Sequence, residues 1–191
     1  MIIRAMVCLL ISANMSLAAD KTVDYRVLAT SKTSTMEKEL NEASEAGFRM
    51  DKVMGGQTTF GGSEVVVVMS KDKSAPAVKK YTYRLLATSK TSTMEKELND
   101  AGREGFRYVD QTAFNTAFGG DEVVSILELE RDSNPRITYE YKLIATSKTS
   151  TMQKELQAAG EQGFSFVGVT VSKTAFGGKE VLSILRKDVL H

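Results

Sequence analysis

The chain has 191 residues, with 25 basic and 24 acidic residues and a formal net charge of +1 at pH 7. This balance argues against a nucleic-acid-binding protein, which needs a strongly basic domain or stripe. The only histidine is the terminal His191 and the only cysteine is Cys8, which excludes the common Ser-His-Asp, Cys-His and zinc or copper designs. We predict no catalytic residue, metal or cofactor and no enzyme activity, although chemistry carried by carboxylates alone stays open.

Residues 1–19 have the pattern of a secretory signal peptide. Arg4 gives a positive start, residues 5–11 are apolar, and small residues precede Asp20. The apolar run is shorter than the ~20 residues that a bilayer span needs, so we expect no membrane span in the mature form; an uncleaved anchor is the alternative. Cleavage removes Arg4 and Cys8, leaving 24 basic and 24 acidic residues. We therefore expect a periplasmic or secreted protein without a disulfide.

The segment Ala29–Met36 recurs letter for letter as Ala87–Met94 and Ala145–Met152, at a step of 58 residues (87 − 29 and 145 − 87). A fixed period without gaps indicates one supersecondary unit present in three tandem copies. Short polar linkers that carry the only two prolines separate the copies. We place the signal peptide at residues 1–19 and the three repeats at residues 20–73, 80–132 and 137–191.

The first part of each unit predicts a strand followed by a helix. Residues Tyr25–Ala29 alternate in a way that suits a strand. Ser34 and Glu37 then match a Ser-x-x-Glu capping box, which predicts a helix that begins near Thr35.

The predicted helix carries a narrow apolar stripe. Met36, Leu40 and Ala43 recur at helical spacing, and Gly47 is expected to end the helix in the left-handed conformation. The residues expected to face water are Glu37, Lys38, Glu39 and Glu42.

Two further strands complete the unit. Residues 48–58 and 63–69 predict a hairpin, because the two adjacent glycines between them suit a tight turn. Val65–Val68 is apolar on both faces, which is typical of a buried central strand. We predict an α+β fold of three tandem β-α-β-β repeats, each a three-stranded antiparallel sheet of order 1-3-2 with one helix on one face.

A single unit of about 50 residues buries too little surface to be comfortably stable alone. One helix covers only one face of its sheet, so we expect the bare sheet faces of neighbouring units to pack on each other. Because three is an odd number, the remaining face would complete a three-way core or form a homo-oligomer through that sheet face.

The repeated Ser-Lys-Thr-Ser-Thr loop is the main candidate binding site. It lies at a helix start, where free amides and the helix dipole favour an anion, and it is unchanged between copies while the second strand has drifted. The alternative is that Ser34 only caps the helix and Lys32 is a solvated charge. The candidate residues are Ser31, Lys32, Thr33, Ser34, Thr35, Ser89, Lys90, Thr91, Ser92, Thr93, Ser147, Lys148, Thr149, Ser150 and Thr151.

Two other features recur in every copy. The turn phenylalanines Phe60, Phe118 and Phe176 are expected to fold back over the core, although an aromatic at such a turn can also grip a flat ligand or a partner chain. The carboxylates that follow are expected to be exposed strand-end groups, with pairing to the lysine loops or carboxylate-based catalysis as the alternatives. These carboxylates are Glu64, Glu122 and Glu180.

Several of these residues also carry a family resemblance. They are Tyr25, Leu40, Gly47-Phe48, Val65–Val68 and Lys71 in the first copy, Tyr83, Leu98 and Gly105-Phe106 in the second, and Tyr141, Leu156, Gly163-Phe164 and Arg186 in the third. In this arrangement the unit resembles the short bacterial β-α-β-β domains classed as domains of unknown function, whose members usually carry Trp where this chain has Phe after the glycine. The resemblance implies the fold and no established activity.

These observations predict an exported, non-catalytic tandem-repeat protein that works as a binding or assembly module. The alternative is a binder of phosphate or another small anion through the three loops. We expect an unknown protein or a small anionic ligand as the partner, and no nucleic acid.

Overall fold

The computed structural model describes residues 22–58, 62–75, 79–88, 90–115, 121–133, 137–173 and 179–190. The first repeat contains β1 (Val23–Thr30), α1 (Thr33–Glu45), β2 (Arg49–Thr58) and β3 (Gly62–Asp72). The second contains β4 (Tyr81–Thr88), α2 (Thr91–Arg103), β5 (Arg107–Asn115) and β6 (Asp121–Glu130). The third contains β7 (Thr138–Thr146), α3 (Thr149–Glu161), β8 (Ser165–Lys173) and β9 (Lys179–Val189). The predicted signal peptide and the turn phenylalanines Phe60, Phe118 and Phe176 lie outside the described residues.

Each repeat forms its own antiparallel sheet, in the orders β1-β3-β2, β4-β6-β5 and β7-β9-β8. The predicted α+β class and the 1-3-2 strand order are therefore confirmed. The outer strands β2, β5 and β8 each carry a register shift at equivalent places, between Met50 and Lys52 in the first repeat, for example. Such a bulge bends the strand and increases its twist. Residues 58 positions apart are called equivalent below.

The helices begin two residues earlier than the capping box predicts. Lys32 is the N-cap of α1 and makes no side-chain capping bond; the same holds for Lys90 and Lys148. The backbone N–H of Lys32 donates to Thr30 Oγ1 at 3.1 Å. The Glu37 carboxylate accepts from the backbone N–H of Leu85, in the next repeat, at 2.8 Å. The capping box and the expectation that Glu37 faces water are both wrong, because a neighbouring strand edge holds the carboxylate.

The helix ends agree with the prediction. Gly47 has a φ of 89°, and its equivalents Gly105 and Gly163 are also left-handed. The N–H of Gly47 donates to the carbonyl of Ser44, and the N–H of Phe48 donates to that of Ala43. These two bonds form a Schellman motif, which satisfies the last carbonyls of the helix.

In each repeat, the phenylalanine after the helix-ending glycine contacts the basic residue of the first strand. The guanidinium of Arg26 lies 4.6 Å from the centre of the Phe48 ring, and Arg84 lies 4.1 Å from the Phe106 ring. Lys142 occupies the same position over Phe164 in the third repeat. Cation–π contact therefore ties the first strand to the helix end in every copy.

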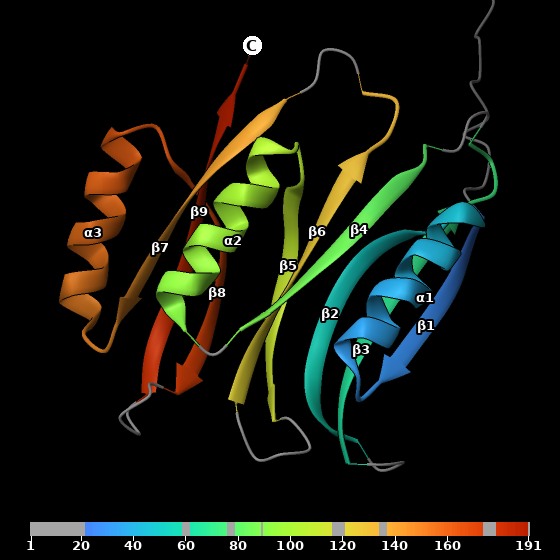
Figure 1. Ribbon diagram of the computed structural model, residues 1–191, viewed down its shortest axis with the longest axis horizontal. Coiled ribbons are helices and arrows are strands. Elements are labelled where there is room, and N and C mark those ends of the chain that lie inside the picture. Colours follow the sequence, from blue (N-terminus) through green and yellow to red (C-terminus); the bar gives the residue numbers. More distant parts are fainter. Residues whose placement is uncertain are drawn as a thin grey trace, which may run out of the picture.

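The three repeats stack along the long axis of the molecule, and their helices run side by side from the same end (Figure 1). The first core joins α1 and β3 of repeat 1, through Met36, Leu40 and Val67, to the opposite side of repeat 2, through Tyr83 and Ile126. A second core joins α2 to repeat 3 in the same way. The helix-bearing side of each sheet therefore meets the bare face of the next sheet, and the expectation that bare faces pack on each other is wrong.

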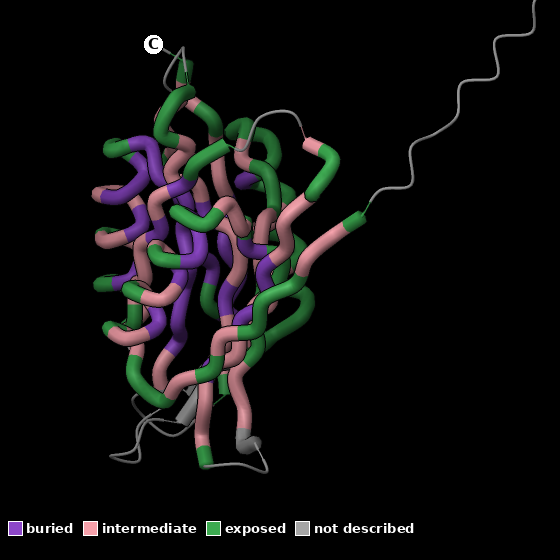
Figure 2. The backbone as a smooth tube through the Cα atoms, turned by 90° about the vertical axis from the view of Figure 1, so that its right-hand side faces the viewer, coloured by how far each residue is buried: buried purple, intermediate pink, exposed green. Residues whose placement is uncertain are grey.

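The hydrophobic core has fewer buried residues at the repeat 3 end. Its cluster contains only Ile144, Ala159 and Leu185 as buried residues, with Leu156 and Phe164 partly buried beside them. At the opposite end, the face of repeat 1 that points away from α1 is called its bare face, because no described residue of another repeat packs on it. Figure 2 looks onto that end and shows intermediate and exposed residues along β1.

Helices α1 and α2 also close the edge of the next sheet. Asn41 of α1 donates to the carbonyl of Tyr83 at 3.0 Å and accepts from its N–H at 2.9 Å. Asn99 of α2 makes the same pair of bonds to Tyr141, both at 2.9 Å. An open strand edge is a template for pairing with another chain, and these helices satisfy the outward backbone groups of β4 and β7.

The two buried tyrosines at these edges reach back to the preceding repeat. Tyr83 Oη accepts from the N–H of Met50 at 2.9 Å, and Tyr141 Oη accepts from the N–H of Tyr108 at 2.6 Å. Burial raises the pKa of both phenols above the ordinary value of 10.0. Their stabilising effect is therefore fully present below pH ~10 and is lost as the pH rises toward the folded pKa. We expect the free energy of unfolding, measured by denaturant titration at a series of pH values, to fall from about pH 10 upward.

Removing a single tyrosine hydroxyl separates the contribution of its hydrogen bond from the contribution of the packed ring. Tyr83→Phe is expected to cost about 1–2 kcal/mol at neutral pH, because the N–H of Met50 loses its acceptor, and to reduce the alkaline loss of stability. Tyr108 Oη is buried with no hydrogen-bond partner among the described residues, so Tyr108→Phe is the matched control and should leave stability unchanged or slightly raised. Equal losses for the two variants in denaturant titrations would contradict the assignment of the Tyr83 bond.

Candidate functional site

The predicted loop residues lie at the three helix starts, at the same end of the molecule (Figure 1). Ser31 and Lys32 are exposed ahead of α1, and Ser147 and Lys148 are exposed ahead of α3. Ser89 lies outside the described residues. The remaining candidates form the first turns of the helices, and they are Thr33, Ser34, Thr35, Thr91, Ser92, Thr93, Thr149, Ser150 and Thr151.

A depression of about 420 Å³ lies beside the loop of the second repeat, lined by Ser92, Glu95, Lys96 and Asn99. Only Ser92 among its lining residues belongs to the repeated loop. Glu95 and Asn99 already bond to the backbone of β7. This depression therefore does not bring the loops of different repeats together.

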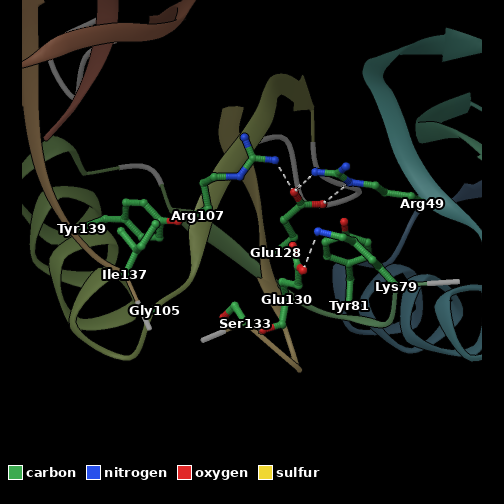
Figure 3. Close-up of a pocket in the computed structure, with 10 residues that line it drawn as sticks. All are labelled: Arg49, Lys79, Tyr81, Gly105, Arg107, Glu128, Glu130, Ser133, Ile137 and Tyr139. Atoms are coloured by element: carbon green, nitrogen blue, oxygen red, sulfur yellow. Dashed lines mark hydrogen bonds and ion pairs between the residues drawn. The ribbon is translucent and has the colours of Figure 1, made fainter. Parts of the chain in front are cut away.

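A second groove, also of about 420 Å³, lies between the repeats and has a buried carboxylate at its centre. Glu128 of β6 is 2% exposed. Arg49 of β2 donates to it from Nη2 at 2.6 Å and from Nε at 3.2 Å, and Arg107 of β5 donates from the other side. Figure 3 shows the two guanidinium groups pointing toward Glu128 from opposite sides. The carboxylate therefore ties repeat 1 to repeat 2.

The other charges of the groove are also paired. Lys79 lies 2.7 Å from Glu130, and this carboxylate raises the pKa of the Lys79 amine. The bond to Glu128 raises the pKa of the Arg49 guanidinium, which also stacks 4.5 Å from the centre of the Tyr81 ring. Because each of these three cations already faces a carboxylate, we interpret the groove as an ion-pair network that joins repeats.

None of these groove residues was a candidate on sequence grounds. The available signal is Glu128 itself, a carboxylate inside the apolar strand Val123–Leu129 where the equivalent residues are Ser70 and Arg186. A buried acidic residue in a central strand needs an oppositely charged or hydrogen-bonding partner, and Arg49 and Arg107 supply it.

We expect Glu128→Ala to lower the free energy of unfolding by about 2 kcal/mol. Removing one partner of a buried ion pair costs more than this, typically ~3–5 kcal/mol, but the two arginines here are partly exposed and regain water. Glu130→Ala is the matched control, because the Lys79–Glu130 pair lies nearer to solvent and its loss should cost much less than the loss of Glu128. Urea titration of the three proteins measures the difference, and similar losses in both variants would contradict a special role for Glu128.

Within the described ranges, no group of three or more His, Cys, Asp or Glu side chains is placed to hold a metal ion. In the same part of the chain, no helix has the length and apolar character needed to cross a bilayer.

The remaining surface feature is apolar and lies at the two ends of the stack. Tyr25, Val27 and Met54 are exposed on the bare face of repeat 1. Phe166, Val169 and Val171 of β8 are exposed at the repeat 3 end. Among the described residues, Leu190 is the only other exposed large hydrophobic side chain. Exposed apolar patches on a soluble protein commonly mark interaction sites.

The fold and these end faces define a tandem-repeat α+β protein with exposed apolar side chains at both ends of the stack. No family model, curated protein or solved structure gives a significant match to the chain. The resemblance to the bacterial β-α-β-β domains therefore stays a prediction.

Proposed function

We propose that the protein is an exported, non-catalytic assembly module that associates through the apolar faces at the two ends of its stack. The observation that supports this most directly is the contrast between equivalent residues. Tyr83 and Tyr141 are 2% and 3% exposed inside the stack, whereas Tyr25 at its end is 69% exposed. Two of the three equivalent tyrosines are therefore buried at an interface between repeats, and the third is exposed.

Sedimentation velocity over a wide concentration range tests this function. We expect the wild-type protein to associate as its concentration rises, and a variant with polar end faces, Tyr25→Ser with Phe166→Ser, to remain monomeric. Leu190→Ser removes an exposed apolar side chain outside both faces and should behave as wild type. If the wild type and the end-face variant sediment as the same monomer throughout, the assembly function is wrong.

A second candidate function is the binding of phosphate or a similar anion at the helix starts. It is favoured by one observation: none of the three N-cap lysines makes a side-chain capping bond, so the first-turn amides of each helix can face an anion. Calorimetry with inorganic phosphate tests it. We expect heat from the wild type and a reduced signal from the combined Lys32→Ala, Lys90→Ala and Lys148→Ala variant, and equal signals would end this candidate.

A further inference from the structure

We propose that copies of this chain associate head to tail, with the bare sheet face of repeat 1 in one copy docked onto α3 and β8 of another copy. This inference rests on the proposed assembly function and adds its geometry and partner. The reason is continuity: the chain already contains the same junction twice, between repeats 1 and 2 and between repeats 2 and 3. A second copy would supply a third junction of the same design.

The apolar groups at the two ends match the two sides of that junction. On the receiving side, Met50 and Tyr108 are buried between repeats, and their equivalent Phe166 is 52% exposed. On the entering side, Tyr83 and Tyr141 are buried and their equivalent is Tyr25. Docking would place the Tyr25 hydroxyl near the backbone N–H of Phe166, as Tyr83 is placed near that of Met50.

The polar groups that close the strand edge are also present. In the internal junctions, a glutamate and an asparagine on the helix bond to the backbone of the next first strand. In α3 the equivalent residues are Gln153 and Gln157, and both are exposed. A glutamine amide accepts and donates as an asparagine amide does. These side chains can therefore bond to the open edge of β1 in a second copy, at Val27 and Tyr25.

The charged groups of the first internal junction have charged equivalents at the two ends of the chain. Glu45, at the end of α1, pairs with Arg131 of the next repeat and with Lys80 at 3.2 Å. The residues equivalent to Glu45 and Arg131 at the free ends are Glu161 and Lys73. Lys73 now pairs with Asp24 at the surface. The two end faces thus carry opposite charges at the place where the first internal junction has an ion pair.

Gly160 of α3 is consistent with the docking of a second copy against this helix. At Gly102 of α2, a Cβ would lie 2.2 Å from the carbonyl oxygen of Tyr139, so the next repeat approaches the helix closely there. At the equivalent Gly160, nothing lies within 4 Å of a Cβ. Glycine weakens a helix relative to alanine, and no contact among the described residues accounts for it at this position. The close approach of β1 from a second copy would account for it.

Such an interface uses different surfaces on the two partners. A heterologous contact of this kind produces an open chain of copies, or a ring if the rotation between copies closes. The alternative geometry, in which two identical end faces pair, would stop at a dimer.

Mixing two single-face variants distinguishes these geometries. One variant carries Tyr25→Ser and Val27→Ser, and the other carries Phe166→Ser and Val169→Ser; all four side chains are exposed, and thermal unfolding checks that both variants fold. Sedimentation velocity is expected to show higher oligomers for the wild type, monomers for each variant alone, and a dimer for the equimolar mixture, because each variant keeps one intact face. A variant that associates alone as well as the wild type overturns the head-to-tail geometry and leaves the assembly function standing. A wild type that stays monomeric at every concentration overturns both.

A substitution at Gly160 provides an independent measurement. Gly160→Lys adds an exposed, helix-compatible side chain that the single chain accommodates, and it should weaken association at least about tenfold, equivalent to ~1.4 kcal/mol. The control is Lys154→Ala, on the same helix at an exposed position, which should leave association unchanged. Unchanged association in Gly160→Lys, with wild-type thermal stability, would overturn the docking of β1 against α3.

Discussion

Leu98→Ala is expected to lower the free energy of unfolding by about 4 kcal/mol, near the upper part of the range for buried leucines. Leu98 lies on α2 and is fully buried between the sheet of repeat 2 and the bare face of repeat 3. Its equivalent Leu156 is only partly buried, because no sheet of another repeat packs on α3 in the part of the chain that the structure describes. Leu156→Ala should therefore cost about half as much or less.

Denaturant titration below the concentration at which copies associate measures both variants. Leu40→Ala serves as the positive control, because Leu40 is fully buried against repeat 2, and it should resemble Leu98→Ala. Three equal losses would mean that the leucines are buried by their own repeats alone, and that stacking contributes little to the core.

Gly168→Val is expected to cost about 3 kcal/mol, the upper end of the range for overpacking a core. A Cβ at Gly168 would lie 2.2 Å from Tyr108 Oη and 2.7 Å from Tyr108 Cζ. The tyrosine ring is buried between repeats 2 and 3, and a close-packed interior resists its displacement. The equivalent pair of positions in the first junction holds Met50 and Asp110. A large residue on one side of the second junction is thus matched by a glycine on the other.

A double-mutant cycle tests this compensation. Adding Tyr108→Met, which introduces the residue of the equivalent position in repeat 1, should recover about half or more of the stability that Gly168→Val loses. Gly56→Val is the matched control, because nothing lies within 4 Å of a Cβ at this strand glycine. If Tyr108→Met fails to recover stability by calorimetry, the loss comes from the backbone of β8 and not from the tyrosine.

Local rules were sufficient for the type and order of the elements in each repeat. The apolar stripe of Met36, Leu40 and Ala43 is buried as predicted, and Gly47 ends the helix as predicted. The valine-rich run identified the central strand and hence the strand order. In each case the pattern that decides the element lies within one unit, so the sequence can reveal it.

Interactions between repeats were not accessible in this way. Ser34 and Glu37 match a capping box, but the carboxylate of Glu37 binds the N–H of Leu85 in the next repeat. The alternation of apolar and polar residues predicted that the strands are amphipathic. It did not predict which repeat each face of a sheet packs against. The groove around Glu128 depends on three strands from two repeats, and nothing in the local spacing of Arg49 or Arg107 indicates that they converge.

Because α1 and α2 each close the edge of the sheet that follows, the stack is a one-dimensional array with nearest-neighbour coupling. The inner unit is held on both flanks, whereas the outer units are held on one flank only. Fraying on heating should therefore proceed from the ends inward, beginning at repeat 3, where the smallest cluster of buried residues remains. Lengthening the array by further copies would add stability without altering any existing unit, because every new junction would follow the pattern already present.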